Sequence, residues 1–227
     1  LSGLAGAVAA AGGVGMISTA QIGFREPEFE QAPIETNLRC IGRELEKARA
    51  IAPEGVIGCN IMVATKRYED YVRAAVEAGA DLIVSGAGIP EKLPALTKGS
   101  RTRIAPVVSS YKAAAVIFRL WDRHYGTAPD LVVAEGPEAG GHLGFRREQL
   151  AESGGEAFDE ELKKILELAA GYGEKYGKKI PVAAAGGIGT RAEAAHSLDE
   201  VGVQAIQAAT CFVTTEECDA PPAYKQA

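Results

Sequence analysis

The sequence has no long apolar run, no excess of positive charge and no closely spaced cysteine pair. Its 227 residues carry 24 Lys and Arg against 30 Asp and Glu, which gives a formal net charge of −6. The apolar runs fall far short of the roughly 20 residues of a membrane-spanning helix, so we expect no membrane span. Negative net charge without a basic cluster also makes nucleic acid a poor partner.

Cysteine is also sparse, with four residues at positions 40, 59, 211 and 218. They form no Cys-x-x-Cys pair, and no histidine lies nearby at metal-ligand spacing, so we expect no metal site and no disulfide framework. Reduced thiols are typical of a cytoplasmic protein. The first residues carry no Lys or Arg, which argues against a signal peptide. Because the chain starts at Leu1 and ends without a stop signal, both ends are expected to continue in a longer chain.

Short apolar runs recur along the chain, and most are followed by an amphipathic helical pattern. The runs are rich in Val, Ile, Leu or Ala and are bounded by Gly, Pro or Asp, as expected of strands buried on both faces. They cover residues 14–18, 56–63, 81–85, 104–109, 131–135, 180–185 and 205–210. Alternating strands and helices predict a parallel sheet covered by helices.

The chain opens on a helical segment, residues 2–11, for which Ser2 is the expected N-cap. A strand should precede it, and adding that strand to the seven visible runs gives the eight of a (β/α)8 TIM barrel. We therefore predict one α/β barrel domain over residues 1–227, with its first strand and its C-terminal part missing. A doubly wound open sheet is the alternative, but no Gly-x-Gly-x-x-Gly turn follows the early strands.

The tract over residues 135–144, Glu-Gly-Pro-Glu-Ala-Gly-Gly-His-Leu-Gly, directly follows a predicted strand. Its four glycines let the backbone approach a planar ligand closely, and His142 can exchange a proton near neutral pH. A loop with a surface histidine is the alternative interpretation. His124 and His196 fall in helical patterns and are interpreted as structural.

A second glycine tract, residues 183–190, follows the seventh expected strand of the barrel. Gly186 and Gly187 followed by a helix from Arg191 predict a nest of backbone N–H groups suited to a phosphate dianion. The loops after strands seven and eight are the usual phosphate site of such barrels. Thr210 and its neighbouring amides are expected to form the other wall.

Polar residues also mark other strand ends. Asn60 interrupts an apolar run, and a buried amide without a hydrogen bond costs about 1–3 kcal/mol. A ligand would satisfy Asn60, and so would a neighbouring strand or water; we weight these alternatives equally. Residues 85–88 and the pair Ser109 and Ser110 are expected to form small polar walls at the mouth of the barrel.

These tracts together resemble the nitronate monooxygenase family, whose flavin barrels also include a flavin-dependent enoyl-ACP reductase. The resemblance runs over nearly the whole chain. The most specific matches are Gly-Pro-Glu-Ala-Gly-Gly-His-Leu-Gly at 136–144 and Thr-Glu-Glu-Cys-Asp-Ala at 215–220. Less specific matches lie at 4–8, 12–15, 60–62, 84–88 and 184–188.

The resemblance implies FMN as cofactor and His142 as the catalytic histidine. The residues that it places around the flavin are Asn60, Glu135, Gly140, Gly186, Gly187, Gln207, Ala209 and Thr210. Glu135 stands where members often have Gln. The family usually has Gly-Thr-Arg-Phe after the eighth strand, where this chain has Ala-Thr-Cys-Phe at 209–212.

The function that this resemblance implies is oxidation of alkyl nitronates by O2 to a carbonyl compound and nitrite. An NADH-dependent enoyl-ACP reductase on the same FMN barrel is the alternative. A third hypothesis is a non-catalytic phosphate-ligand barrel whose flavin site has decayed at Ala209 and Cys211. The expected partners are a small-molecule substrate and O2, with a homodimer as one option for the assembly, in the cytoplasm.

Overall fold

The computed structural model describes residues 1–140 and 155–226, and these divide into two compact units. The first unit comprises Leu1–Gly88, Ala95–Arg103 and the segment from Thr210 onward. The second comprises Ile89–Pro94 and Ile104–Ala209. The single domain expected over residues 1–227 therefore stays a prediction.

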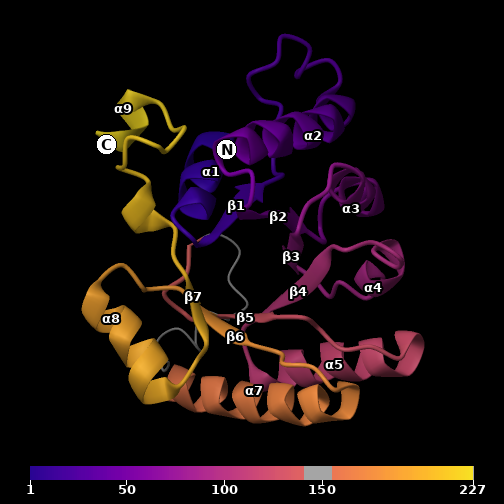
Figure 1. The fold of residues 1–227 in the computed structure, drawn as a ribbon, viewed down its shortest axis with the longest axis vertical. Helices are drawn as coiled ribbons and strands as arrows, with labels where there is room; N and C mark the ends of the chain where they lie inside the picture. The colour runs from indigo at the N-terminus through magenta and orange to yellow at the C-terminus, as the bar shows by residue number, and fades with distance from the viewer. Residues whose placement is uncertain (141–154, 227) are drawn as a thin grey trace. The chain divides into compact units, whose positions relative to one another are not determined.

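The first unit has a parallel sheet with helices packed on it. Its strands are β1 (Val14–Ser18), β2 (Val56–Met62) and β3 (Leu82–Gly86), and its helices include α1 (Ser2–Ala10), α2 (Pro33–Ile51) and α3 (Tyr68–Glu77). The short helices η2 (Thr210–Phe212) and α9 (Pro222–Lys225) follow in its last segment, and α4 (Leu93–Leu96) crosses the boundary between the units. In Figure 1, α1 lies against α2 and beside β1. The parallel register places Ser18 beside Asn60, and Asn60 beside Val84.

The helix at residues 2–10 forms as predicted, but Ser2 is not its N-cap. The cap residue is Leu1, and no side chain caps this end of the helix. The backbone N–H of Ser2 instead donates to Oε2 of Glu44 at 3.1 Å. Glu44 comes from α2, so an acceptor distant in sequence takes the place of the local cap.

The second unit also has a parallel sheet. Its strands are β4 (Arg103–Val108), β5 (Val132–Glu135), β6 (Val182–Ala185) and β7 (Ala205–Gln207). Its helices include α5 (Tyr111–Tyr125), α7 (Gly155–Tyr176), α8 (Arg191–Ala195) and the π-helix η1 (His196–Val201). β5 pairs with β4 and β6, and β6 also pairs with β7, always in parallel. In Figure 1, α5 and α7 run side by side.

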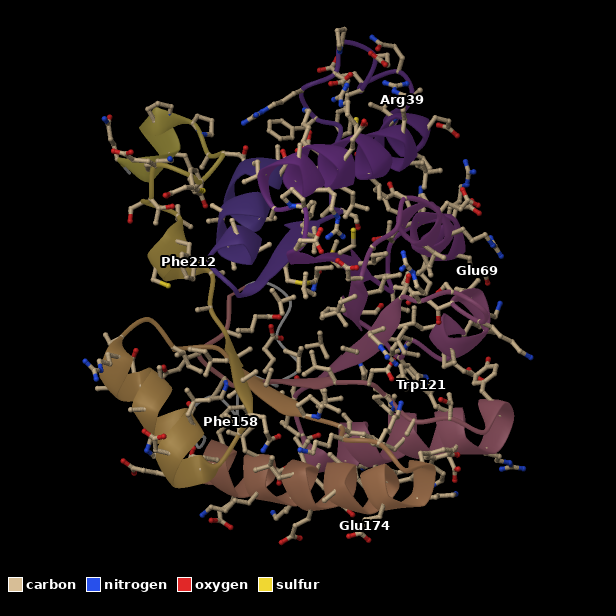
Figure 2. All side chains as sticks on the ribbon, viewed as in Figure 1. Arg39, Glu69, Trp121, Phe158, Glu174 and Phe212 are labelled. Atoms are coloured by element: carbon tan, nitrogen blue, oxygen red, sulfur yellow. The ribbon has the colours of Figure 1, made fainter. Side chains whose placement is uncertain are left out.

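Helix α5 shows how local sequence sets the bounds of an element in this unit. Ser110 is its N-cap, and the Ser110 hydroxyl accepts a hydrogen bond from the N–H of Ala113 at 3.3 Å. The helix ends at Gly126, which has a φ of +60°, a left-handed conformation that glycine adopts without strain. Trp121, labelled on α5 in Figure 2, is fully buried and donates from Nε1 to the carbonyl of Pro90 at 3.1 Å.

Each of the seven predicted strands is present, which confirms the alternation of strands and helices. The main difference is at the last strand, because β7 ends at Gln207 and Thr210 begins the helix η2. Cys40, Cys59, Cys211 and Cys218 are free thiols. Within the described residues, no helix is both long and apolar enough to cross a membrane.

Candidate functional site

The C-terminal ends of the strands in the second unit carry the polar residues that the sequence singled out. The parallel register pairs Glu135 with Ala185, and Ala185 with Gln207. Paired residues of parallel strands project from the same face of a sheet. Glu135 and Gln207 therefore stand on one face, on either side of the small side chain of Ala185.

The loop after β5 packs directly on the loop after β6. The backbone N–H of Gly136 donates to the carbonyl of Ala185 at 2.8 Å. Gly186 and Gly187 have φ values of +91° and +73°. A Cβ on Gly186 would lie 2.9 Å from the nitrogen of Ala139, and a Cβ on Gly187 would collide with the carboxylate of Glu138. Both positions therefore require glycine, for conformation and for space.

The amides that follow this turn are only partly available to an anion. Among the described residues, the N–H groups of Gly187 and Ile188 have no hydrogen-bond acceptor. The N–H groups of Gly189 and Thr190, however, both donate to Oε2 of Glu193 at 2.8 Å. These backbone hydrogen bonds lower the pKa of Glu193. Two of the four amides from Gly187 to Thr190 thus serve a carboxylate of the chain itself, and the phosphate site stays a prediction.

Glu193 was missed in the sequence although a signal was present. Residues 190–193 read Thr-Arg-Ala-Glu, which matches the Ser/Thr-x-x-Glu capping box. The structure shows both halves of that box, since the hydroxyl of Thr190 also accepts from the N–H of Glu193 at 3.3 Å.

Glu135 is half-buried and has no hydrogen-bond partner in the described part of the chain. Burial raises the pKa of its carboxyl. A Cβ on the adjacent Gly136 would lie 2.9–3.3 Å from ring carbons of Phe158, so the strand end is closely covered by α7 at that position. Phe158 is labelled on α7 in Figure 2. The carboxyl of Glu135 thus stands at a strand end without a hydrogen bond to any residue that the structure describes.

The remaining predicted residues of the second unit lie in exposed or half-exposed loops. Gly140 is exposed, and a Cβ there would meet nothing within 4 Å. Gln207 is half-buried and Ala209 is exposed. His142, the predicted catalytic residue, lies outside the described residues.

Asn60 and Thr210 belong to the first unit. Asn60 is half-buried at the end of β2, and its backbone carbonyl accepts from the N–H and the hydroxyl of Thr19, each at 3.1 Å. Its side-chain amide has no partner among the described residues. Thr210 is exposed. That these two residues meet those of the second unit stays a prediction.

Two serines of the expected polar walls, Ser85 and Ser110, use their hydroxyls within the fold. Ser85 is fully buried, and its hydroxyl donates to the carbonyl of Ile61 at 2.8 Å. It also bonds the hydroxyl of Tyr68 at 2.9 Å, and burial raises the pKa of Tyr68 to about 12. Ser110 is the N-cap of α5, and its hydroxyl accepts a hydrogen bond from the N–H of Ala113. Both hydroxyls are used by the fold.

The two described histidines are structural, as predicted. His124 pairs with Glu91 at 3.2 Å. Nε2 of His196 lies 2.8 Å from Asp159 and its Nδ1 lies 3.0 Å from Glu200. These carboxylates, Asp159 above all, raise the pKa of His196. Within the residues that the structure covers, no group of three or more His, Cys, Asp or Glu could hold a metal ion.

The fold of the chain is shared with several solved structures. FabK from Thermotoga maritima is 27% identical, with a TM-score of 0.71, over 100% of this chain and 59% of that one. An IMP dehydrogenase/GMP reductase-like protein from Corynebacterium glutamicum is 14% identical, with a TM-score of 0.67, over 96% and 62%. KGPDC from Streptococcus mutans is 14% identical, with a TM-score of 0.54, over 95% and 85%. These are TIM barrels, so the predicted fold class is confirmed.

The chain thus spans less than two thirds of the length of FabK and of the Corynebacterium protein. A comparison with curated proteins found no match. The family model described as nitronate monooxygenase matches residues 2–227. By this match the chain belongs to the nitronate monooxygenase family.

Proposed function

We propose that the full-length protein is an FMN-dependent oxidoreductase that converts alkyl nitronates and O2 into a carbonyl compound and nitrite. Membership of the nitronate monooxygenase family supports this activity. The main structural support is the turn at Gly186 and Gly187. This turn follows the end of β6, which pairs with the strand ends at Glu135 and Gln207. Phosphate groups and polar heterocycles bind at such strand ends in barrels of this fold.

The residues present fit a flavin mononucleotide. The N–H groups of Gly187 and Ile188 have no acceptor in the described chain and would hold the phosphate. Glu135 and Gln207 would hydrogen-bond the ring, because their side chains stand on one face with only Ala185 between them. The family resemblance implies further flavin contacts from Gly140 and Ala209 of the second unit and, separately, from Asn60 and Thr210 of the first.

The flavin, when bound, supplies the redox chemistry by taking electrons from the substrate and passing them to O2. The protein has to orient the substrate and manage protons around it. His142 is the proposed group for this task, since imidazole titrates near neutral pH and can hold or move a proton at the nitronate.

An enoyl-ACP reductase that uses NADH is the second candidate. The similarity to FabK over the whole of this chain favours it, because FabK is an FMN-dependent enoyl-ACP reductase of the same barrel type. The two candidates share the flavin site and differ in what reduces it.

Anaerobic reduction of the bound flavin separates the two candidates. The full-length protein is mixed without oxygen with propyl-2-nitronate or with NADH, and the loss of flavin absorbance is followed. Fast bleaching by the nitronate and slow bleaching by NADH is the result expected of a nitronate monooxygenase. Fast bleaching by NADH, followed by turnover of a crotonyl thioester, would replace this proposal with the reductase.

A third candidate, a phosphate-ligand barrel without catalysis, would use the same turn to hold its ligand. Glu193 adds negative charge beside the proposed phosphate position and occupies two amides there. A protein that binds inorganic phosphate but neither FMN nor riboflavin would support this function over both enzymes.

A further inference from the structure

Glu135 and Gln207 form a polar pair across the ends of three neighbouring strands. Adjacent parallel strands lie about 4.8 Å apart, so two residues separated by one strand are roughly 10 Å apart. The residue between them, Ala185, has only a methyl group and is 2% exposed. Ala185 itself offers almost no surface to a ligand, so the two longer side chains are the groups of this strand end that would hydrogen-bond a flat ring.

The carboxyl of Glu135 differs from Gln207 because it can change charge. The paired parts of β4 and β6 carry no charged side chain beside it, and Arg103 is at the opposite end of β4. Its own loop carries the acidic residue Glu138, and the start of α7 carries Asp159 and Glu160. None of these contributes to the pKa of Glu135, which is raised by burial.

We propose that Glu135 is a pH-sensitive positioning residue. Its neutral carboxylic acid holds the flavin ring, and ionisation of this carboxyl weakens flavin binding. This inference rests on the proposed flavin function. It assigns to this chain a dependence of cofactor affinity on pH that a glutamine at position 135 would not give.

Ionised Glu135 would weaken flavin binding because the ring would cover the charged carboxylate and remove water from it. The carboxyl of Glu135 is already half-buried and has no partner among residues 1–140 and 155–226, and a neutral ring placed over it would remove more of its water. Desolvation disfavours the ionised form and raises the pKa further in the complex. The neutral acid also has an O–H that can donate to a ring carbonyl, whereas the carboxylate can only accept.

The direction in which flavin affinity changes with pH follows from the linkage between proton binding and flavin binding. If the pKa of Glu135 is higher in the complex than in the free protein, flavin binding takes up a proton. The dissociation constant is then lowest below the free-protein pKa and increases as pH rises through the range between the two values. Each unit of difference between these pKa values weakens binding by about tenfold at most.

The test uses the full-length protein as wild type, Glu135→Gln and Glu174→Gln. Glutamine keeps the size of glutamate and a hydrogen-bond donor but cannot ionise. Glu174 is an exposed carboxylate at the far end of α7 (Figure 2), so it is the matched control. Dissociation constants for FMN and for riboflavin are measured by flavin fluorescence from pH 4.5 to pH 8.

The measured quantity is the ratio of the wild-type dissociation constant to that of Glu135→Gln. The second ionisation of the FMN phosphate, near pH 6, acts on both proteins and cancels in this ratio. Titration of His142 cancels in the same way. We expect the ratio to increase by about threefold to tenfold with rising pH, for FMN and riboflavin alike, and Glu174→Gln to follow the wild type.

The outcomes separate this inference from the function on which it rests. A ratio that stays constant with pH, with both proteins binding flavin tightly, overturns the role of Glu135 and leaves the flavin function standing. A ratio that falls with rising pH overturns it as well. Failure of all three proteins to bind either flavin at any pH overturns the proposed function together with the inference.

Discussion

Thr190 and Glu193 cap each other at the start of α8. The hydroxyl of Thr190 accepts from the N–H of Glu193 at 3.3 Å, and the carboxylate of Glu193 accepts from the N–H of Thr190 at 2.8 Å. A capping box usually stabilises a helix start. Here it also holds the turn that leaves Gly187, so helix stability and the proposed phosphate site share one segment.

Thr190→Ala should lower the free energy of unfolding by about 0.5–2 kcal/mol, the usual cost of removing a threonine N-cap. The variant loses the hydroxyl that accepts from Glu193. Thr190→Ser keeps that hydroxyl and should stay near the wild-type value. Chemical denaturation of the three proteins measures the difference, and equal stability of the alanine and serine variants would contradict a stabilising cap.

Gly187→Ala should destabilise the turn and weaken FMN binding. Its φ of +73° costs an alanine about 1–2 kcal/mol, and the new Cβ would collide with the carboxylate of Glu138. Gly189→Ala is the matched control, because a Cβ there meets nothing within 4 Å. Isothermal titration with FMN compares the two. Similar affinities for both variants would show that the phosphate is held elsewhere.

The contribution of His196 to stability should disappear at alkaline pH. Its carboxylate partners, Asp159 first, raise its pKa above the ordinary value of 6.5. A raised pKa stabilises the folded state fully below the unfolded pKa, and the contribution is lost as pH rises through the folded value. The melting temperature of the wild type should therefore fall relative to His196→Gln between about pH 6 and pH 9. A constant difference between the two would contradict the ion pairs.

His142→Ala should keep bound flavin and lose most of its turnover of a nitronate. A positioned general acid–base group is worth about 10²–10⁴-fold in rate. His142→Asn, which can still donate a hydrogen bond, should retain part of the activity if positioning contributes. The measurement is kcat/KM with bound FMN confirmed by spectrum. If both variants stay within about threefold of the wild type, well below the acid–base range, the catalytic assignment moves to Glu138.

The strands could be predicted from the sequence because buried parallel strands are continuous apolar runs between glycine, proline and aspartate. The cap of the first helix could not, because Glu44 reaches the N–H of Ser2 from 42 residues away. The same holds for Ser85, whose partners Tyr68 and Ile61 become neighbours only after folding. Hydrogen bonds between distant residues thus override local patterns here.

The sequence predicted which residues lie at the candidate site. It did not predict which of their hydrogen-bonding groups are already used within the chain. Glycine spacing correctly indicated the turn at Gly186 and Gly187, where positive φ and a close loop exclude a side chain. The bond from the N–H of Thr190 to Glu193 was readable from the capping-box spacing, whereas the second bond, from Gly189, was not. The burial that raises the pKa of Glu135 depends on how strands and loops pack in the folded chain, which sequence patterns do not show.

The visible absorption spectrum of the purified full-length protein is the most direct test of the flavin site. We expect a yellow protein with the two absorption bands of an oxidised flavin, and release of FMN into the supernatant on denaturation. A colourless protein that fails to bind added FMN at micromolar concentration would contradict the account. It would leave the glycine turn at Gly187 as part of a barrel that binds another phosphate ligand.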